Sequence, residues 1–280
     1  MKKMTMLKSI ATVALFTVFG MGASAQAPSG NPNYVNDTQA DSVVVGARMP
    51  YYVQPDATVA TMVTAGLLNP SYYKWELPGG AAPLKYDGSA ATPDGTLSTY
   101  YKESEISFIW TSTGSFIVKT TERSNPLSGL TNGCDGSQTT RNVEVVAVPT
   151  INYTNAGGYL GTCGSTTINV PVTLSGTGPW KVSYTVTDAA SNVLTVTDQV
   201  VSDGNMPYRG SVTAIPLSIN FTSAPLTGAA GVYHVAITKV TDRLTAKSLN
   251  GIVGTFNGAS YNVGVLATPT TSPIQYIKNL

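Results

Sequence analysis

Two strand-like runs that carry large aromatic side chains constrain the fold of this chain most strongly. The first, Tyr72–Leu77, contains Trp75 and ends at a Pro-Gly-Gly turn signal. The second, Phe108–Trp110, is followed by Gly114–Thr120, where side chains alternate with a period of two from Phe116 onward. This period is typical of a strand with one buried face. The runs therefore predict an all-β sandwich with aromatic side chains between its sheets.

The same pattern recurs in the second half of the chain. Gly231-Val232-Tyr233 begins an alternating run, as Gly114-Ser115-Phe116 does in the first half. The repetition predicts two tandem immunoglobulin-like β-sandwich domains. The alternative is that two unrelated sandwiches share such a corner. The expected core anchors are Trp75, Trp110, Phe116, Trp180 and Tyr233.

Turn and proline signals give the expected domain boundaries. Residues 41–149 form the first sandwich, closed by an alternating strand at Thr139–Val148, and residues 150–268 form the second. Residues 269–280 are a short Pro/Thr tail. Thr58–Leu68 is the one stretch with some helical character. Its β-branched residues favour a strand with a turn, and a single helical turn is the alternative.

The N-terminus reads as a targeting segment. Residues 1–25 combine a basic start, an apolar run at Ile10–Met21 and the small-residue cleavage pattern Ala23-Ser24-Ala25, which together predict a signal peptide. The mature chain would begin at Gln26, and residues 26–40 would be a flexible leader. An uncleaved anchor is the alternative. Because no cysteine follows the cleavage point, we expect no lipid anchor. We also expect no membrane span in the mature chain.

Charge excludes several partners. The signal peptide removes three of the sixteen Lys and Arg residues and none of the fifteen acids, so the mature chain has a formal charge of −2. This balance gives no electrostatic footprint for nucleic acid or for an anionic membrane surface. Charged residues make up 11% of the chain, against roughly 25% in an average soluble domain. Such usage is typical of an extracellular β protein.

Several motifs then resemble one known family. They are Trp75-Glu76-Leu77-Pro78-Gly79-Gly80, Ile106–Trp110, Thr113–Val118 and Asn132-Gly133-Cys134-Asp135-Gly136. In this order they resemble the PKD-like domains of exported Bacteroidota proteins, over about residues 41–149. Leu174–Tyr184 is similar to the Ig-like units that accompany those domains. The resemblance implies surface or secreted binding and spacing modules, many of them linked to type IX secretion or gliding, with no shared catalytic residues.

The chain also departs from that family. Its members often have a disulfide within each unit, but Cys134 has no partner near Ser42–Val53 and Cys163 has none near Thr241–Gly251. After Thr268 the sequence does not read as the sorting domain of type IX cargo. The expected location is therefore periplasmic, outer-membrane-associated or on the cell surface.

The two cysteines leave two alternatives open. In an oxidising compartment a Cys134–Cys163 bond is the first expectation. A strand over residues 139–148 would carry the chain roughly 33 Å away from Cys134, and residues 149–162 would have to bring it back. Free or intermolecularly paired thiols are the alternative.

Thiol titration of the denatured, unreduced mature protein tests the intramolecular bond. An intramolecular Cys134–Cys163 bond leaves no titratable thiol. Two titratable thiols per chain would exclude the bond.

Catalytic groups are few. His234 is the single histidine, so a catalytic triad or a multi-histidine metal site is not available, and we expect it to be the outward neighbour of buried Tyr233. Glu103 and Glu105 are expected on one solvated strand face. The Asp-Gly pairs predict turns at Asp87, Asp94, Asp135 and Asp203. No cofactor is expected; calcium at converging loops is the alternative.

Paired tyrosines at positions 51–52, 72–73 and 100–101 should each send one ring inward and one outward. The long loop from Pro78 to Tyr101 is the expected contact surface, because long loops on a rigid sandwich often carry function. The chain is thus expected to be a non-enzymatic exported binding or structural module for a protein or glycan at the envelope, of open oligomeric state. A periplasmic accessory subunit of a secretion or gliding machine is one alternative, and a carbohydrate-active enzyme is a second, disfavoured one.

Overall fold

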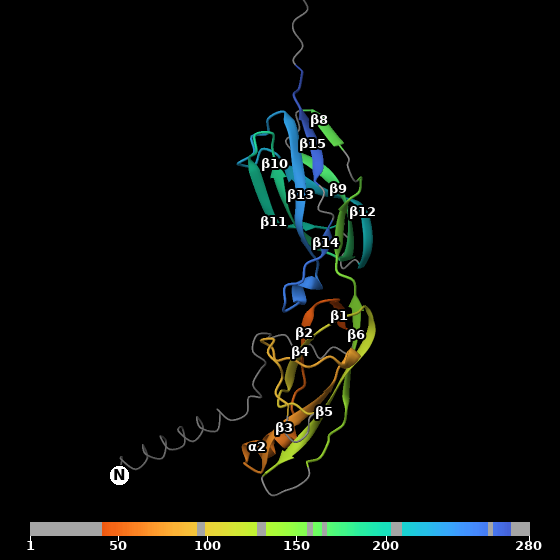
Figure 1. Cartoon of the computed structure of the whole chain (residues 1–280), viewed down its shortest axis with the longest axis vertical. Helices are drawn as coiled ribbons and strands as arrows, with labels where there is room; N and C mark the ends of the chain where they lie inside the picture. Colours follow the sequence, from red (N-terminus) through yellow and green to blue (C-terminus); the bar gives the residue numbers. More distant parts are fainter. Residues whose placement is uncertain are drawn as a thin grey trace, which may run out of the picture. The chain divides into compact units, whose positions relative to one another are not determined.

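The described residues form two compact units, divided between Val146 and Ala147 (Figure 1). The computed structural model describes residues 41–93, 99–127, 133–155, 159–163, 167–202, 209–256 and 260–269. The predicted signal peptide, the leader and the tail beyond residue 269 lie outside these residues. Within them strands predominate, and helix is confined to α2 (Ala57–Thr64) and the 3-10 turns η1 (Pro78–Gly80) and η2 (Thr245–Lys247). The all-β prediction is confirmed.

The first unit pairs its strands in the immunoglobulin manner. Its strands are β1 (Asp41–Val44), β2 (Arg48–Tyr52), β3 (Leu68–Glu76), β4 (Glu105–Ile109), β5 (Gly114–Pro126) and β6 (Thr139–Val146). One sheet has the order β1-β6-β5-β3, and β2 and β4 form a second, antiparallel pair. β1 runs parallel to the last strand, β6, whereas the other pairs are antiparallel. A first strand beside the last one in this way is typical of an immunoglobulin-like sandwich.

Aromatic rings fill the first core. Trp110 is 2% exposed, and its ring centroid lies 4.6 Å from Phe108 and 5.5 Å from Phe116. Its indole Nε1 donates a hydrogen bond to the Tyr51 hydroxyl at 3.2 Å. Trp75 is also buried and donates from Nε1 to the carbonyl oxygen of Glu103. Phe116 is half-buried. Both indoles therefore satisfy their polar atom inside an apolar core.

The second unit is a larger sandwich of the same kind. Its strands are β7 (Thr150–Tyr153), β8 (Tyr159–Cys163), β9 (Thr167–Thr177), β10 (Trp180–Thr187), β11 (Val193–Val201), β12 (Arg209–Asn220), β13 (Gly231–Thr241), β14 (Thr255–Phe256) and β15 (Tyr261–Leu266). They form the sheets β11-β10-β13-β15-β8 and β12-β9-β7-β14. β7 pairs antiparallel with β9 in one sheet, and β8 pairs parallel with β15 in the other. The first two strands of this unit, β7 and β8, therefore belong to different sheets.

Two aromatic anchors of the second core are held by hydrogen bonds. Trp180 is fully buried and donates from Nε1 to the carbonyl oxygen of Ser175 at 3.0 Å. Tyr233 is 1% exposed, and its hydroxyl donates to the carbonyl oxygen of Ala229 at 2.8 Å. A tyrosine at the start of this strand that bonds the backbone a few residues upstream is the tyrosine corner of immunoglobulin-like domains.

The expectation of a strand with a turn at Thr58–Leu68 is wrong, because residues 57–64 form helix α2. Asp56 caps the helix: its Oδ1 accepts hydrogen bonds from the backbone N–H groups of Thr58 and Val59. Gly66, at φ +72°, ends it in the left-handed region. These two end signals outweigh the β-branched residues between them.

A buried carboxylate ties two loops of the second unit together. Asp242 is 4% exposed, and its Oδ1 accepts from the backbone N–H groups of Leu244 and Thr245 and from the Thr245 hydroxyl. Its Oδ2 accepts from the N–H of Thr177 at 2.9 Å. Four donors replace the water that burial removes, so the carboxylate is compensated.

Replacing this group tests that account. Asp242→Asn exchanges one acceptor oxygen for an amide that cannot accept from Thr177, so the free energy of unfolding should fall by about 2–4 kcal/mol. Urea denaturation followed through Trp180 fluorescence measures the change. The matched control is Asp198→Asn, an exposed acid of the same unit, which should change stability little. Equal effects of the two variants would contradict the account.

Candidate functional site

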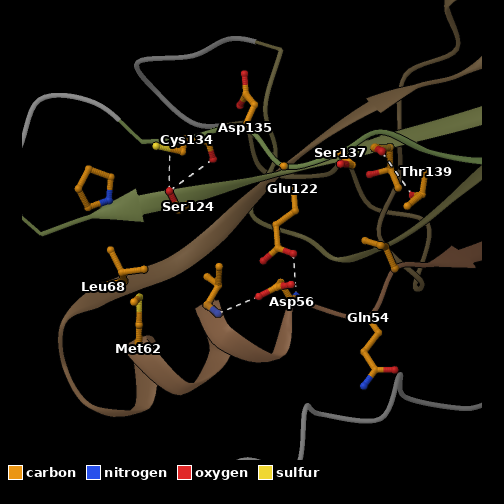
Figure 2. A pocket seen from close by; sticks show the side chains of 15 residues that line it. Gln54, Asp56, Met62, Leu68, Glu122, Ser124, Cys134, Asp135, Ser137 and Thr139 are labelled. Carbon is orange, nitrogen blue, oxygen red and sulfur yellow. Dashed lines mark hydrogen bonds between the residues drawn. The ribbon is translucent and has the colours of Figure 1, made fainter.

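An open groove of about 840 Å³ lies in the first unit (Figure 2). Its floor is one face of β5, and its two walls are the segment from β2 through α2 to β3 and the segment that leads into β6. The lining residues are Val53, Gln54, Asp56, Val59, Met62, Leu68, Thr120, Glu122, Ser124, Pro126, Cys134, Asp135, Gly136, Ser137 and Thr139. Its volume is in the range of ligand pockets.

The length of β5 explains where the groove lies. Residues 114–120 of β5 pair with β6, and residues 119–126 pair with β3. Side chains alternate across a strand, so Phe116, Val118 and Thr120 share one face with Glu122 and Ser124. Phe116 and Val118 face the aromatic core, and Thr120, Glu122 and Ser124 line the groove. The same face of β5 therefore contacts the core with its first residues and lines the groove with its later ones.

One wall is fixed by two carboxylates, as Figure 2 shows. Asp56 caps α2, and Glu122 Oε2 accepts a hydrogen bond from the backbone N–H of Asp56 at 2.8 Å. Glu122 Oε1 accepts from the Ser71 hydroxyl at 2.6 Å. Glu122 thus joins β5 to both the start of α2 and β3. The helix is held across the strand by this side chain as well as by apolar packing.

The other wall extends β5 by a short pairing. Ser124 donates its N–H to the carbonyl of Cys134 at 3.0 Å, and Gly136 donates its N–H to the carbonyl of Glu122 at 2.8 Å. The Cys134 N–H donates to the Ser124 hydroxyl oxygen. These bonds place Cys134 and Asp135 at the rim of the groove, with the Asp135 side chain pointing away from it (Figure 2).

Asp135 is tied to a second loop and to a cation. Its Oδ1 accepts from the Tyr100 hydroxyl at 2.8 Å and from Arg123 Nη1 at 3.0 Å. Burial alone would raise the pKa of Asp135, but hydrogen bonds from Tyr100 and Arg123, together with the positive charge of Arg123, outweigh it and lower the pKa. The charge of Asp135 is therefore matched within the protein.

The groove is acidic and apolar. Its charged lining residues are Asp56, Glu122 and Asp135, and among the described residues no cation pairs with Asp56 or Glu122. Apolar contact surface comes from Val53, Val59, Met62, Leu68 and Pro126. Thr120 is 7% exposed, and its Oγ1 has no hydrogen-bond partner within the part of the chain that the structure describes. The site can hold a cationic group beside an apolar one.

Both cysteines are exposed, one in each unit. Cys134 stands at the rim of the groove, and Cys163 ends β8. The pairing of Cys134 with Cys163 stays a prediction.

His234, Glu103 and Glu105 were the candidate catalytic groups of the sequence, and the structure shows where each one lies. His234 is exposed beside buried Tyr233, with its Nδ1 2.7 Å from Asn262 Oδ1. The expectation that Glu103 decorates a solvated strand face is wrong. It precedes β4, is half-buried, and accepts hydrogen bonds from the Thr92 N–H while its Oε1 lies 3.6 Å from Lys85 Nζ. Burial raises the pKa of Glu105 at the start of β4.

Metal and membrane features are not seen in the described part of the chain. No three His, Cys, Asp or Glu side chains gather there in an arrangement that could hold a metal ion. The predicted turns at Asp94-Gly95 and Asp203-Gly204 lie outside the described residues. No helix in the described ranges is long and apolar enough to cross a bilayer.

The expected contact loop is not part of the groove. The described residues of loop 78–101 do not line it, although Tyr100 reaches its rim residue Asp135. Tyr73 and Tyr100 are buried while their neighbours Tyr72 and Tyr101 are half-exposed, as expected. The residues at 51 and 52 are both half-buried, so there the alternation is not followed.

Comparisons with known proteins show distant similarities to several solved structures. No known protein family matches the sequence, and no curated protein matches it. Fibronectin(III)-like modules of Clostridium thermocellum CbhA are similar at 10% identity and a TM-score of 0.32, over 86% of this chain and 97% of that one. An I-band fragment of titin has 11% identity and a TM-score of 0.27, over 82% of this chain and 62% of that one. The CBD12 fragment of CALX1.2 has 10% identity and a TM-score of 0.24, over 80% and 96%.

The immunoglobulin-like class of both units follows from the strand pairing described above. Both sandwiches place an early strand parallel to the last one, which fits that class.

The tie between Tyr100 and Asp135 can be tested by titration. In Tyr100→Phe one hydrogen bond to the charged carboxylate is lost, so the pKa of Asp135 should rise toward its ordinary value. Carbon-13 NMR of the Asp135 carboxyl measures this pKa. Because the pKa is lowered in the folded state, the stability that Asp135 contributes is present at neutral pH and is lost as the pH falls through that pKa. Tyr101→Phe, its neighbour, is the control and should leave the pKa unchanged.

Proposed function

We propose that this protein is a non-enzymatic, exported binding module that holds a segment of a partner protein in the groove of its first unit. The observation that carries the proposal is the groove itself. It is open, its floor is a rigid strand, and both its walls are pinned by hydrogen bonds to that strand. Sites of this kind are preorganised, which reduces the entropy lost on binding.

The N-terminal pattern supports export. Three lysines, the apolar run Ile10–Met21 and Ala23-Ser24-Ala25 have the layout of a secretory signal peptide. The resemblance of residues 41–149 to PKD-like domains of Bacteroidota supports a place at the envelope of such a cell, either on the surface or as a periplasmic accessory of a secretion or gliding machine.

The side chains support binding rather than catalysis. His234 is exposed and pairs with Asn262. Glu103 is engaged by Thr92 and Lys85. Such positions supply neither the base and nucleophile of a hydrolase nor the facing carboxylates of a glycosidase.

Crosslinking from the groove tests the proposal, because Cys134 offers a thiol at its rim. In Cys163→Ser, Cys134 is labelled with a benzophenone maleimide, and the mature protein is irradiated with the envelope fraction of its own cells. The expected result is a defined adduct whose crosslinked peptide, read by mass spectrometry, belongs to one partner protein.

The matched control is Cys134→Ser labelled at Cys163, a similarly exposed thiol on the other unit. It should give no such adduct. Absence of a protein adduct from Cys134 across periplasmic, outer-membrane and surface fractions would contradict the proposal.

A further inference from the structure

We infer that the groove selects an extended protein segment in which a Lys or Arg side chain stands beside an apolar one. The inference rests on the proposed function and adds to it the chemistry of the partner. The basic group would lie at Glu122 and Asp56, and the apolar neighbour would lie on the side chains of α2 and β3.

Charge is the first argument. Glu122 accepts one hydrogen bond at each carboxylate oxygen, from the N–H of Asp56 and from Ser71. Both donors are neutral, so the negative charge is not balanced. The neighbouring Asp56 adds a second charge, and no cation pairs with either in the described residues. Two like charges in a half-enclosed groove favour a cationic ligand.

An unpartnered hydroxyl is the second, independent argument. Thr120 lines the groove, is 7% exposed, and leaves its Oγ1 without a hydrogen-bond partner among the described residues. Buried hydroxyls in folded proteins are normally paired, so an unpaired one is costly. It stands one step along the strand face from Glu122. A ligand group placed between them would pair with Glu122 directly, and with the covered Thr120 hydroxyl once that side chain turns toward the groove.

The shape of the floor favours an extended segment. The floor consists of Thr120, Glu122, Ser124 and Pro126, alternate residues of one strand. Six residue steps at about 3.3 Å each make it roughly 20 Å long, which is the span of about six residues of extended chain.

Other ligands fit this surface less well. None of the fifteen lining residues is aromatic, so the groove offers no ring on which a sugar could stack, and aromatic rings are what supply large contact area at low entropy cost. The described acids do not gather in a metal-binding arrangement. An organic cation with an apolar neighbour therefore remains the best match.

The probe is a random heptapeptide library displayed on phage, selected against the immobilised mature protein. Selected peptides should be enriched in Lys or Arg next to Leu, Ile, Val or Met. The best peptide is then synthesised, and its dissociation constant is measured by fluorescence polarisation. Replacing its basic residue by norleucine should weaken binding about tenfold, and raising the salt concentration should also weaken it.

Two variants of the protein locate the effect. Glu122→Gln should weaken binding about tenfold. Met62 is 42% exposed on α2, so Met62→Lys and Met62→Glu can be made without disturbing the core. Both remove the same apolar contact with the ligand, and Met62→Lys should weaken binding more because it also places a competing cation at the groove. Glu76→Gln is the control, since Glu76 is an acid of β3 that pairs with Lys74 outside the groove. Thermal unfolding confirms that each variant is folded.

The outcomes separate the two proposals. Selected peptides without a basic residue, or binding that Glu122→Gln and Met62→Lys leave unchanged, would overturn the inference. If Cys134 nevertheless crosslinks to a partner protein, the proposed function stands. If no peptide is selected and no protein adduct forms, both fail, and binding of a glycan array or of calcium by the same protein would then identify the other ligand class.

Discussion

Strand β5 is longer than the sandwich that it helps to form, and the groove depends on this surplus. Thirteen residues run from Gly114 to Pro126, but the aromatic core meets only the first part of the strand, at Phe116 and Val118. The facing sheet, β2 with β4, has two strands against four. The rest of the inner face of β5 must be covered by something else or remain open. Helix α2 and the Cys134–Gly136 segment each cover one side of it, and the groove is the gap that remains.

Two acids show how a structural carboxylate differs from one available to a ligand. Asp242 in the second unit is 4% exposed and accepts from four donors at its two oxygens. Glu122 in the first unit accepts from two donors and is half-exposed at the floor of a groove. A carboxylate oxygen has two acceptor sites, so Glu122 can still bind a donor. The first acid serves the fold alone, whereas the second can serve both fold and ligand.

Alternating patterns allowed most strands to be predicted. The alternating stretch predicted as a strand over Thr139–Val148 forms β6, Thr139–Val146, because period-two alternation is a local property of a half-buried strand. β7 and β8 were not expected, since they are four and five residues long and their positions are fixed by partners far along the chain. Helix α2 could have been found from Asp56 and Gly66, which are ordinary start and stop signals.

The groove could not have been found in this way. It requires Asp56, Glu122 and Cys134 to meet, and no local pattern gives the pairing of β5 with residues 134–136. The long loop from Pro78 to Tyr101 was a reasonable alternative on general grounds, but the sequence contained no sign that Tyr100 is buried against Arg123 and Asp135. The position of the groove is determined by the pairing of segments that are far apart in the sequence.

The corner at the start of β5 and β13 shows two physical solutions to one problem. In the second unit the Tyr233 hydroxyl bonds the Ala229 carbonyl, so the loop before the strand is fixed by a directional bond. In the first unit Phe116 occupies the matching position without a hydroxyl, and its ring packs against Trp110 and lies 3.6 Å from the position of a Cβ on Gly114. A ring contact gives burial but fixes no direction. In the first unit, the pairing of β5 with β6 and β3 holds the strand, and the aromatic cluster packs the corner at its start. Farther along the strand, the hydrogen bonds of Glu122 add a directional link to α2 and β3.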